Sequence, residues 1–245
     1  MAVANSVVRQ KREAASYFVE RLLESGVRDE LVEILLFGSV ARGTAQNSSD
    51  IDVMIIGVGN LERIREVASD VQLDTYEKYE EGVEYLVYPL ERLRFPSSYF
   101  LYRVLRHGKE IYRMDDTSLR RREAENYLQL SEEYQEGAQE AFKAKRWRIA
   151  TDAAYNAAEL SIKGLLLLEQ GDLPTSHGGL VGAFGRLYVK SGKIPKIVGR
   201  QLNQGLELRN KARYELNADI DHDKAESVLE LARRLQKVLA AELKE

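Results

Sequence analysis

The spacing of apolar residues differs between the two halves of the chain. In the first half, apolar residues at helical spacing over about 5–24 are followed by continuous apolar runs at about 31–37 and 51–57. A third run, from Val83 to Tyr88, is rich in β-branched and aromatic residues and stops at Pro89. Helical patterns at about 60–69 and 97–107 separate and follow these runs. The pattern therefore predicts a small α/β or α+β domain built on a mixed sheet.

From Thr117 onward the pattern is helical throughout. Asp116 or Thr117 is a candidate cap for a helix whose apolar stripe consists of Tyr127, Leu130, Tyr134, Ala138 and Ala141. The next helix carries small residues between Ala150 and Leu165, and further helices are expected at about 178–190, 196–216 and 222–244. Helices joined by short connections predict an antiparallel bundle. We expect an α+β protein whose domains cover residues 1–115 and 116–245.

Composition narrows the classes of function. The chain has 245 residues, which is enough for two domains, and no apolar run approaches the ~20 residues of a membrane span. The N-terminal segment has no signal-like apolar core, so we expect a cytoplasmic protein. The chain has no cysteine, which excludes disulfides and thiolate zinc sites. A net charge of −3 means that any nucleic-acid binding would rest on local patches.

Two aspartates open the second apolar run. In a strand, residues two apart face the same side, so Asp50 and Asp52 should project together while Ile51 and Val53 face the core. Two carboxylates this close repel each other, and Mg²⁺ is the oxygen-liganded cation that would neutralise them. Glu84 on the third run is the expected third acid. Its competitors, Asp74 and Glu77, lie in a charge-rich stretch that looks solvated.

A glycine–serine turn follows the first apolar run. Gly38 lets the backbone approach a ligand closely, and Ser39 supplies a hydroxyl and an N–H group. A short helix beginning near Ser39 would point its positive end at phosphate, and Arg42 adds a cation within reach. Ser49 completes the expected nucleotide-binding set, just before Asp50.

The turn and the aspartates together resemble the signature of the polymerase β-like nucleotidyltransferase superfamily. Gly38 to Gly43 is most similar to the minimal nucleotidyltransferase branch, and the match extends over roughly 30–115. The resemblance implies that Gly38 and Ser39 hold phosphates. It also implies that Asp50, Asp52 and Glu84 bind the metal and catalyse the transfer.

The second half resembles the HEPN family, a helical domain often fused to such transferases. The resemblance lies in residues 153–166, 176–180 and 207–214. Catalytic members carry an Arg followed by a His that handles the proton of a 2′-hydroxyl. Here Arg209 and Asn210 begin the motif, but Tyr214 occupies the expected His position, and a phenol of pKa ~10 is a poor base at neutral pH. Ribonuclease activity is therefore not expected, and these three residues are interpreted as a binding cleft or a dimer interface.

The sequence thus predicts a Mg²⁺-dependent enzyme that moves a nucleoside monophosphate, with ATP as the expected donor, to a hydroxyl. The acceptor is left open as a protein, an RNA end or a small molecule, and the resemblance implies a homodimer. One alternative is a non-catalytic nucleotide- or RNA-binding regulator of the toxin–antitoxin type. Another is an antibiotic-type nucleotidyltransferase that recruits Glu80 and Glu81 for a cationic drug.

Overall fold

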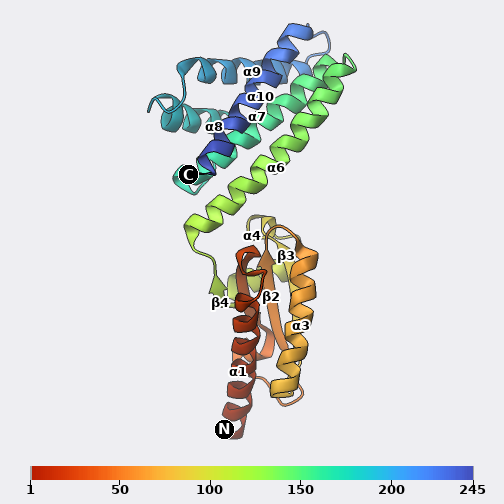
Figure 1. Cartoon of the computed structure of the whole chain (residues 1–245), viewed down its shortest axis with the longest axis vertical. Coiled ribbons are helices and arrows are strands. Elements are labelled where there is room, and N and C mark those ends of the chain that lie inside the picture. Colours follow the sequence, from red (N-terminus) through yellow and green to blue (C-terminus); the bar gives the residue numbers. More distant parts are fainter. Residues whose placement is uncertain (1, 245) are drawn as a thin grey trace. The chain divides into compact units, whose positions relative to one another are not determined.

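The computed structural model describes residues 2–244, and of residues 2–5 and 94 only the backbone. It divides into two compact units, a sheet unit at residues 1–115 and a helical unit at residues 116–245. Figure 1 shows the strands confined to the first unit and long helices making up the second. The expected α+β class is confirmed.

The sheet unit is built on a mixed sheet of β1 (Leu31–Phe37), β2 (Ile51–Gly57), β3 (Val83–Pro89) and β4 (Lys109–Arg113). The strand order is β3-β2-β1-β4, with β1 antiparallel to both β2 and β4 and β2 parallel to β3. A parallel pair needs a crossover connection, and α3 (Leu61–Tyr79) supplies it. Because of this crossover, β2 and β3 run in the same direction, and their first residues, Ile51 and Val83, lie side by side.

Two helices cover one face of this sheet, α1 (Ala2–Glu24) and α3. The core on that face joins alternate residues of β2 to both helices: Ile51, Val53 and Ile55 with Ala14, Phe18, Leu22, Ile64 and Ala68. Because side chains alternate along a strand, Asp52 faces away from this core. Shorter helical segments complete the unit: the 3-10 helix η1 (Arg28–Glu30), α2 (Gly38–Arg42), α4 (Glu91–Arg94) and α5 (Tyr99–His107).

Helix α3 continues to Tyr79, so the expected end near residue 69 was wrong. The charged stretch does not end the helix, because Val71 and Thr75 continue its buried face into the core. The helix ends at Glu80, which adopts the left-handed conformation with a φ of 54° and donates its N–H to the carbonyl of Tyr76 at 2.8 Å. After that reversal, Glu81 and Gly82 lead directly into β3.

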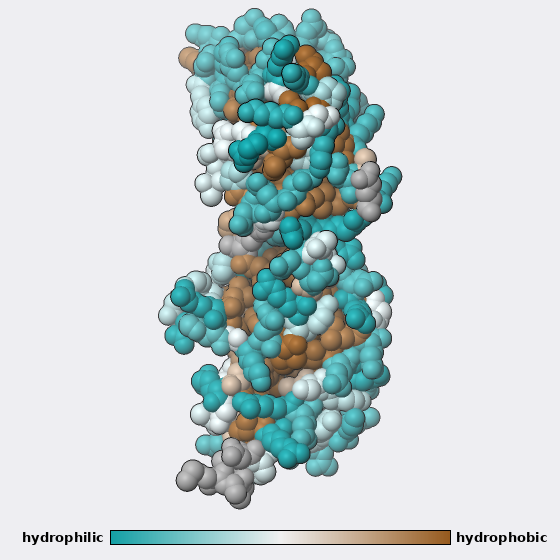
Figure 2. Space-filling model, turned by 90° about the vertical axis from the view of Figure 1, so that its left-hand side faces the viewer, coloured by the Kyte–Doolittle hydropathy of each residue, from teal (hydrophilic) through white to brown (hydrophobic). Residues whose placement is uncertain are grey.

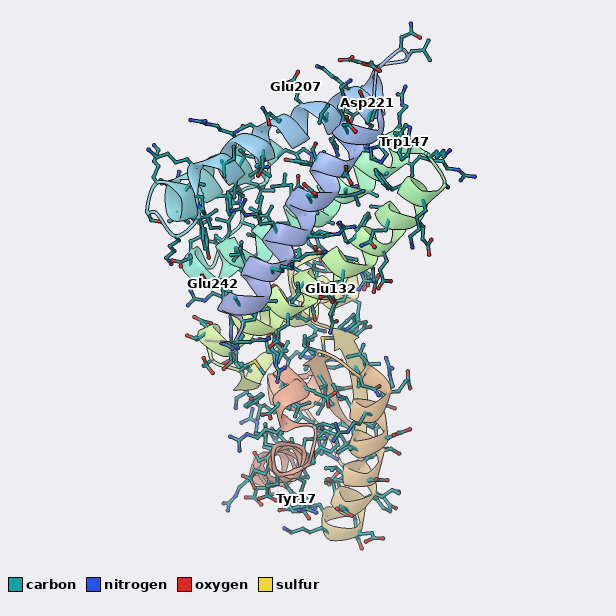
Figure 3. The ribbon with its side chains drawn as sticks, turned by 45° about the horizontal axis from the view of Figure 1, so that its top comes forward. Tyr17, Glu132, Trp147, Glu207, Asp221 and Glu242 are labelled. Carbon is teal, nitrogen blue, oxygen red and sulfur yellow. The ribbon has the colours of Figure 1, made fainter. Side chains whose placement is uncertain are left out.

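The helical unit consists of α6 (Asp116–Lys143), α7 (Trp147–Gln170), α8 (His177–Phe184), the π-helical segment η2 (Gly185–Val189), α9 (Lys196–Tyr214) and α10 (His222–Glu242). Helices α6, α7 and α10 lie alongside one another (Figure 1), and α7 is the most buried of them. At one end, Trp147 of α7 lies close to Asp221, the cap of α10 (Figure 3), and its ring centroid is 5.4 Å from that of His222. The helix expected at 178–190 is observed as α8, which continues directly into the π-helical η2.

The buried face of α6 is rotated from the expected stripe. Ala138 is buried, but Leu130 and Tyr134 are about 40% exposed, while Ser131 and Gln135 are buried instead. Small side chains let α6 approach α7 closely, and the Ser131 hydroxyl donates to the Ala157 carbonyl at 2.8 Å. Apolar residues consequently reach the surface as patches among hydrophilic ones (Figure 2). No described helix is both long and apolar enough to cross a membrane.

Candidate functional site

Neighbouring parallel strands bring two carboxylates together. Asp52 of β2 is the direct register partner of Glu84 of β3. In register partners the side chains emerge on the same face, so both carboxylates lie on the face away from the core of α1 and α3. Pairing between segments 32 residues apart in the sequence thus creates the acid pair.

Asp50 completes this acidic group from the turn before β2. Its side chain is exposed, and a Cβ at Gly82 would lie only 2.8 Å from its Oδ1 atom. The N–H of Ile51 donates to the Gly82 carbonyl at 2.9 Å, which fixes the two turns together. The chain at residues 80–82 therefore forms one wall of the space around Asp50.

The charges of the three acids act on one another. Burial raises the pKa of the Asp52 carboxyl, the nearby Glu84 and Asp50 carboxylates raise this pKa further, and the Arg42 guanidinium opposes them. Within the part of the chain that the structure describes, no hydrogen bond or ion pair satisfies any of the three carboxylates. A group of acids left in this way is stabilised by a bound cation.

The turn at Gly38 lies directly against Asp52. Gly38 has a φ of 68°, in the left-handed region, and a Cβ at this position would overlap the Asp52 carboxylate. Ser39 and Val40 follow in the first turn of α2, where backbone N–H groups have no partner within the helix. This arrangement puts N–H donors suitable for phosphate oxygens next to the acids.

The remaining two residues of the expected nucleotide-binding set differ in their surroundings. Arg42 ends α2, is exposed, and is close enough to Asp52 to act on its pKa. The hydroxyl of Ser49 accepts the N–H of Gln46 at 2.9 Å, closing the turn that leads to Asp50. Ser49 therefore stabilises this turn, and its part in nucleotide binding stays a prediction.

The competing acids lie elsewhere. Asp74, on α3, forms an ion pair with Arg21 of α1 at 3.5 Å. Glu81 forms an ion pair with the buried Lys11, so it does not offer a free carboxylate to a cationic drug. Glu84 remains the acid on β3 that shares a face with Asp52.

A cavity of about 520 Å³ adjoins the acid pair. It is lined by Phe37, Asp52, Gln72, Glu84, Tyr85, Leu86 and Phe100. The rings of Phe37 and Phe100 meet edge to face at 5.6 Å, and the side chains of Leu86 and Phe100 are substantially exposed. The cavity thus combines a carboxylate end with an apolar, aromatic wall.

Within the HEPN-like motif, Arg209 and Asn210 contact each other, and Tyr214 contacts Arg213, which shares the carboxylate of Asp152 with Arg209. Arg209 is 4% exposed and its Nε lies 3.3 Å from Oδ1 of Asp152, which also forms an ion pair with Arg213. Asn210 accepts a hydrogen bond from Arg209 at 3.1 Å. Tyr214, at the end of α9, is 72% exposed. Arg209 is therefore buried in this ion-pair cluster, whereas Tyr214 lies exposed at its edge.

Comparison with protein-family models supports the family predicted for each half of the chain. Residues 17–128 match the model of the nucleotidyltransferase domain, and residues 124–243 match the model of the HEPN domain. The chain belongs to the nucleotidyltransferases that carry a HEPN domain. The acid group, the Gly38 turn and the cavity all lie in its nucleotidyltransferase domain, and Arg209 lies in its HEPN domain.

Two relatives of this nucleotidyltransferase–HEPN chain come from Methanocaldococcus jannaschii and are named as candidate toxins. MJ0605 is 33% identical over 109 residues, which is 44% of this chain and 80% of the relative. MJ0142 is 22% identical over 109 residues, 44% of this chain and 74% of the relative. These names apply to the two relatives and do not by themselves assign a function to this chain.

Among solved structures, spectinomycin adenyltransferase AAD(9) from Enterococcus faecialis, crystallised with ATP and spectinomycin, is 14% identical. The match covers 92% of this chain and 99% of that chain, with a TM-score of 0.33. At that score no shared arrangement of the two chains follows.

Sequence reasoning missed several residues that shape the site in the nucleotidyltransferase domain. Gly82 could have been found from its place directly before the third apolar run, and Phe37 from its place directly before Gly38. Phe100 belongs to an amphipathic helix and gave no signal that it would reach Phe37. Lys11 is one charge among many on α1, and nothing in the pattern marks it as buried.

Proposed function

We propose that the protein transfers a nucleoside monophosphate, with ATP as donor, to a hydroxyl group and releases pyrophosphate. The observation that carries this proposal is the pairing of Asp52 with Glu84 on adjacent parallel strands, with Gly38 packed against the Asp52 carboxylate. Acids for a metal and backbone donors for phosphates are thereby combined in one place. The acceptor would be a protein, an RNA end or a small molecule.

The residues present fit Mg²⁺. Asp50, Asp52 and Glu84 offer oxygen atoms only, and Gly38 and Gly82 leave the room beside them that a Cβ would fill. When bound, Mg²⁺ would offset the charge of the triphosphate and lower the pKa of the acceptor hydroxyl. The three carboxylates would hold the ion, and the raised pKa of Asp52 reflects first its burial and then the repulsion by Glu84 and Asp50.

Other residues would bind and orient the nucleotide. The N–H groups at the start of α2 would hold phosphate oxygens, with Arg42 adding positive charge. The aromatic wall of the cavity beside Asp52 and Glu84 would receive the nucleoside, because a base stacks favourably on Phe side chains.

The direct test uses ATP labelled at the α-phosphate. Wild-type protein with Mg²⁺ should transfer label to itself, to RNA or to a small hydroxyl compound and release pyrophosphate. Asp50→Asn should lower the rate about 1,000-fold, because metal stabilisation of the transferring group is worth several kcal/mol. Asp74→Asn is the matched control, since Asp74 pairs with Arg21 away from the acid group. Tight ATP binding without transfer to any acceptor would instead favour the nucleotide-sensing regulator.

For the HEPN domain we propose a role in binding or dimerisation rather than RNA cleavage. Arg209 is buried in an ion pair with Asp152, and the Tyr214 phenol that takes the place of the expected His is exposed. The names of the Methanocaldococcus relatives are compatible with a regulator of the toxin–antitoxin type. Wild-type protein should leave single-stranded RNA intact without added metal. Cleavage that disappears in Arg209→Ala would overturn this assignment.

A further inference from the structure

A lysine on α1 is buried against the two backbone segments that flank Asp50. Lys11 is 1% exposed, although it lies on the helix that covers the opposite face of the sheet. Its ammonium group forms an ion pair with Glu81, whose side chain is also largely buried, and donates to the carbonyl of Asn47 at 3.3 Å. One buried cation thus connects three segments that are far apart in the sequence.

Both segments that Lys11 holds lead to Asp50. Asn47 lies in the turn that enters β2 three residues before Asp50. Glu81 directly precedes Gly82, which packs against the Asp50 carboxylate and accepts the Ile51 N–H. Asp50 has no hydrogen bond or ion pair of its own within the described residues, so its position depends on these two backbone segments.

The pair is poorly explained as a source of stability alone. Taking a lysine and a glutamate out of water costs several kcal/mol, and apolar replacements of a buried pair are often neutral or stabilising. Partners behind a metal ligand, by contrast, typically change metal affinity 10- to 100-fold when they are removed.

We propose that Lys11 and Glu81 are positioning residues that hold Asp50 in place for the metal. The inference rests on the proposed function, because it requires that Asp50 binds a divalent cation. Lys11 itself would touch neither metal nor nucleotide.

The test compares the double variant K11M/E81Q, which removes both charges at similar side-chain size, with wild-type protein. The affinity for Mn²⁺ is measured calorimetrically in the presence of a non-hydrolysable ATP analogue. We expect a loss of about 10-fold or more, together with faster amide hydrogen exchange at residues 44–51. Excess Mn²⁺ should restore label transfer in K11M/E81Q but not in Asp50→Asn.

The control is R63M. Arg63 joins two segments in a similar way, through Glu30 at 2.9 Å and the Gly26 carbonyl at 3.0 Å, but at the opposite end of the strands from Asp52. R63M should leave the Mn²⁺ affinity unchanged. If K11M/E81Q lacks a cooperative melting transition, the Mn²⁺ affinity of the single variant E81Q is compared with that of wild-type protein instead.

The outcomes separate the two proposals. Unchanged Mn²⁺ affinity in K11M/E81Q, or an equal loss in R63M, would overturn the positioning role while the proposed function stands. Failure of wild-type protein to bind Mn²⁺ with the nucleotide would overturn the proposed function itself, and the positioning role with it.

Discussion

In the nucleotidyltransferase domain, Asp50, Asp52 and Glu84 have no hydrogen bond or ion pair among the described residues, and burial and mutual repulsion raise the pKa of Asp52. In the HEPN domain, Arg209 is buried against Asp152, which Arg213 also contacts. Both domains carry charged residues that resemble a catalytic motif. Within the described residues, the acids of the first domain have no ion pair, whereas Arg209 of the second is ion-paired with Asp152, although neither its Nε nor the Asp152 Oδ1 forms a hydrogen bond. Resemblance of a motif therefore has to be read together with the partners of its residues.

After Asp50→Asn, the largest expected effect comes from Gly38→Ala. The added methyl group would overlap the Asp52 carboxylate, and the left-handed φ of 68° adds backbone strain. We expect label transfer to fall about 100-fold, as small displacements of reacting groups commonly cause. The control is Gly137→Ala on α6, where a Cβ meets nothing within 4 Å and the helix should gain about 0.5–1 kcal/mol. If Gly38→Ala transfers label at the wild-type rate, the conformation of the Gly38 turn does not affect the function of the acid group.

The second prediction tests whether the HEPN arginine is structural. Arg209→Ala should lower the free energy of unfolding by about 2 kcal/mol, because it removes one of two cations from the Asp152 carboxylate. Urea denaturation measures this loss. Arg200→Ala, on the exposed side of the same helix, should stay within about 0.5 kcal/mol of wild type. Equal denaturation midpoints for the two variants would remove the contrast between the domains.

The third prediction concerns the aromatic wall. Phe100→Ala should raise the KM for ATP about 5-fold, near the lower end of what stacking on an aromatic side chain contributes, with little change in kcat. Tyr99→Ala is the control, because Tyr99 is more exposed and does not line the cavity. An effect on the acceptor KM alone would assign the cavity to the acceptor instead of the nucleoside.

The smallest effect is the dependence of stability on pH. Because the pKa of Asp52 is raised in the folded protein, the folded state binds this proton more readily than the unfolded state. The resulting stabilisation is present at low pH and is lost as the pH rises through the raised pKa. Without metal, Asp52→Asn should thus be more stable than wild type at pH 7, by less than about 1 kcal/mol given solvent screening.

Melting curves at pH 7 and pH 4 measure this difference, which should shrink at the lower pH. Mg²⁺ with nucleotide should raise the melting temperature of wild type and not of Asp52→Asn. Identical melting curves for both proteins at both pH values would mean that the pKa of Asp52 is not raised in the folded protein.

Local pattern was sufficient for much of the nucleotidyltransferase domain. The runs at 31–37 and 51–57 match β1 and β2, and the alternation around Ile51 and Val53 correctly turned Asp52 away from the core. The third run correctly predicted β3. Its parallel pairing and its register with β2 depend on the crossover through α3, which no local pattern specifies. The roles of Asp50, Asp52 and Glu84 stay predictions until metal binding is measured.

The sequence-based predictions were wrong where tertiary packing decides which face of a helix is buried. The end of α3 was placed too early because charged residues hide the buried Val71 and Thr75. On α6, Ser131 and Gln135 are buried in preference to Leu130 and Tyr134, because close packing on α7 favours small side chains and hydrogen bonds. The burial of Lys11 was equally hidden, since its partner Glu81 is distant in the sequence.

The overlap at Gly38 also constrains how this protein can change over generations. Every missense mutation of a glycine codon introduces a Cβ, and at position 38 that atom would collide with the Asp52 carboxylate. The Gly38 turn and Asp52 consequently cannot change independently, because a new side chain at position 38 requires a compensating change at position 52. A lineage that loses this glycine should lose most of the proposed transfer activity in one step, with its HEPN domain still folded.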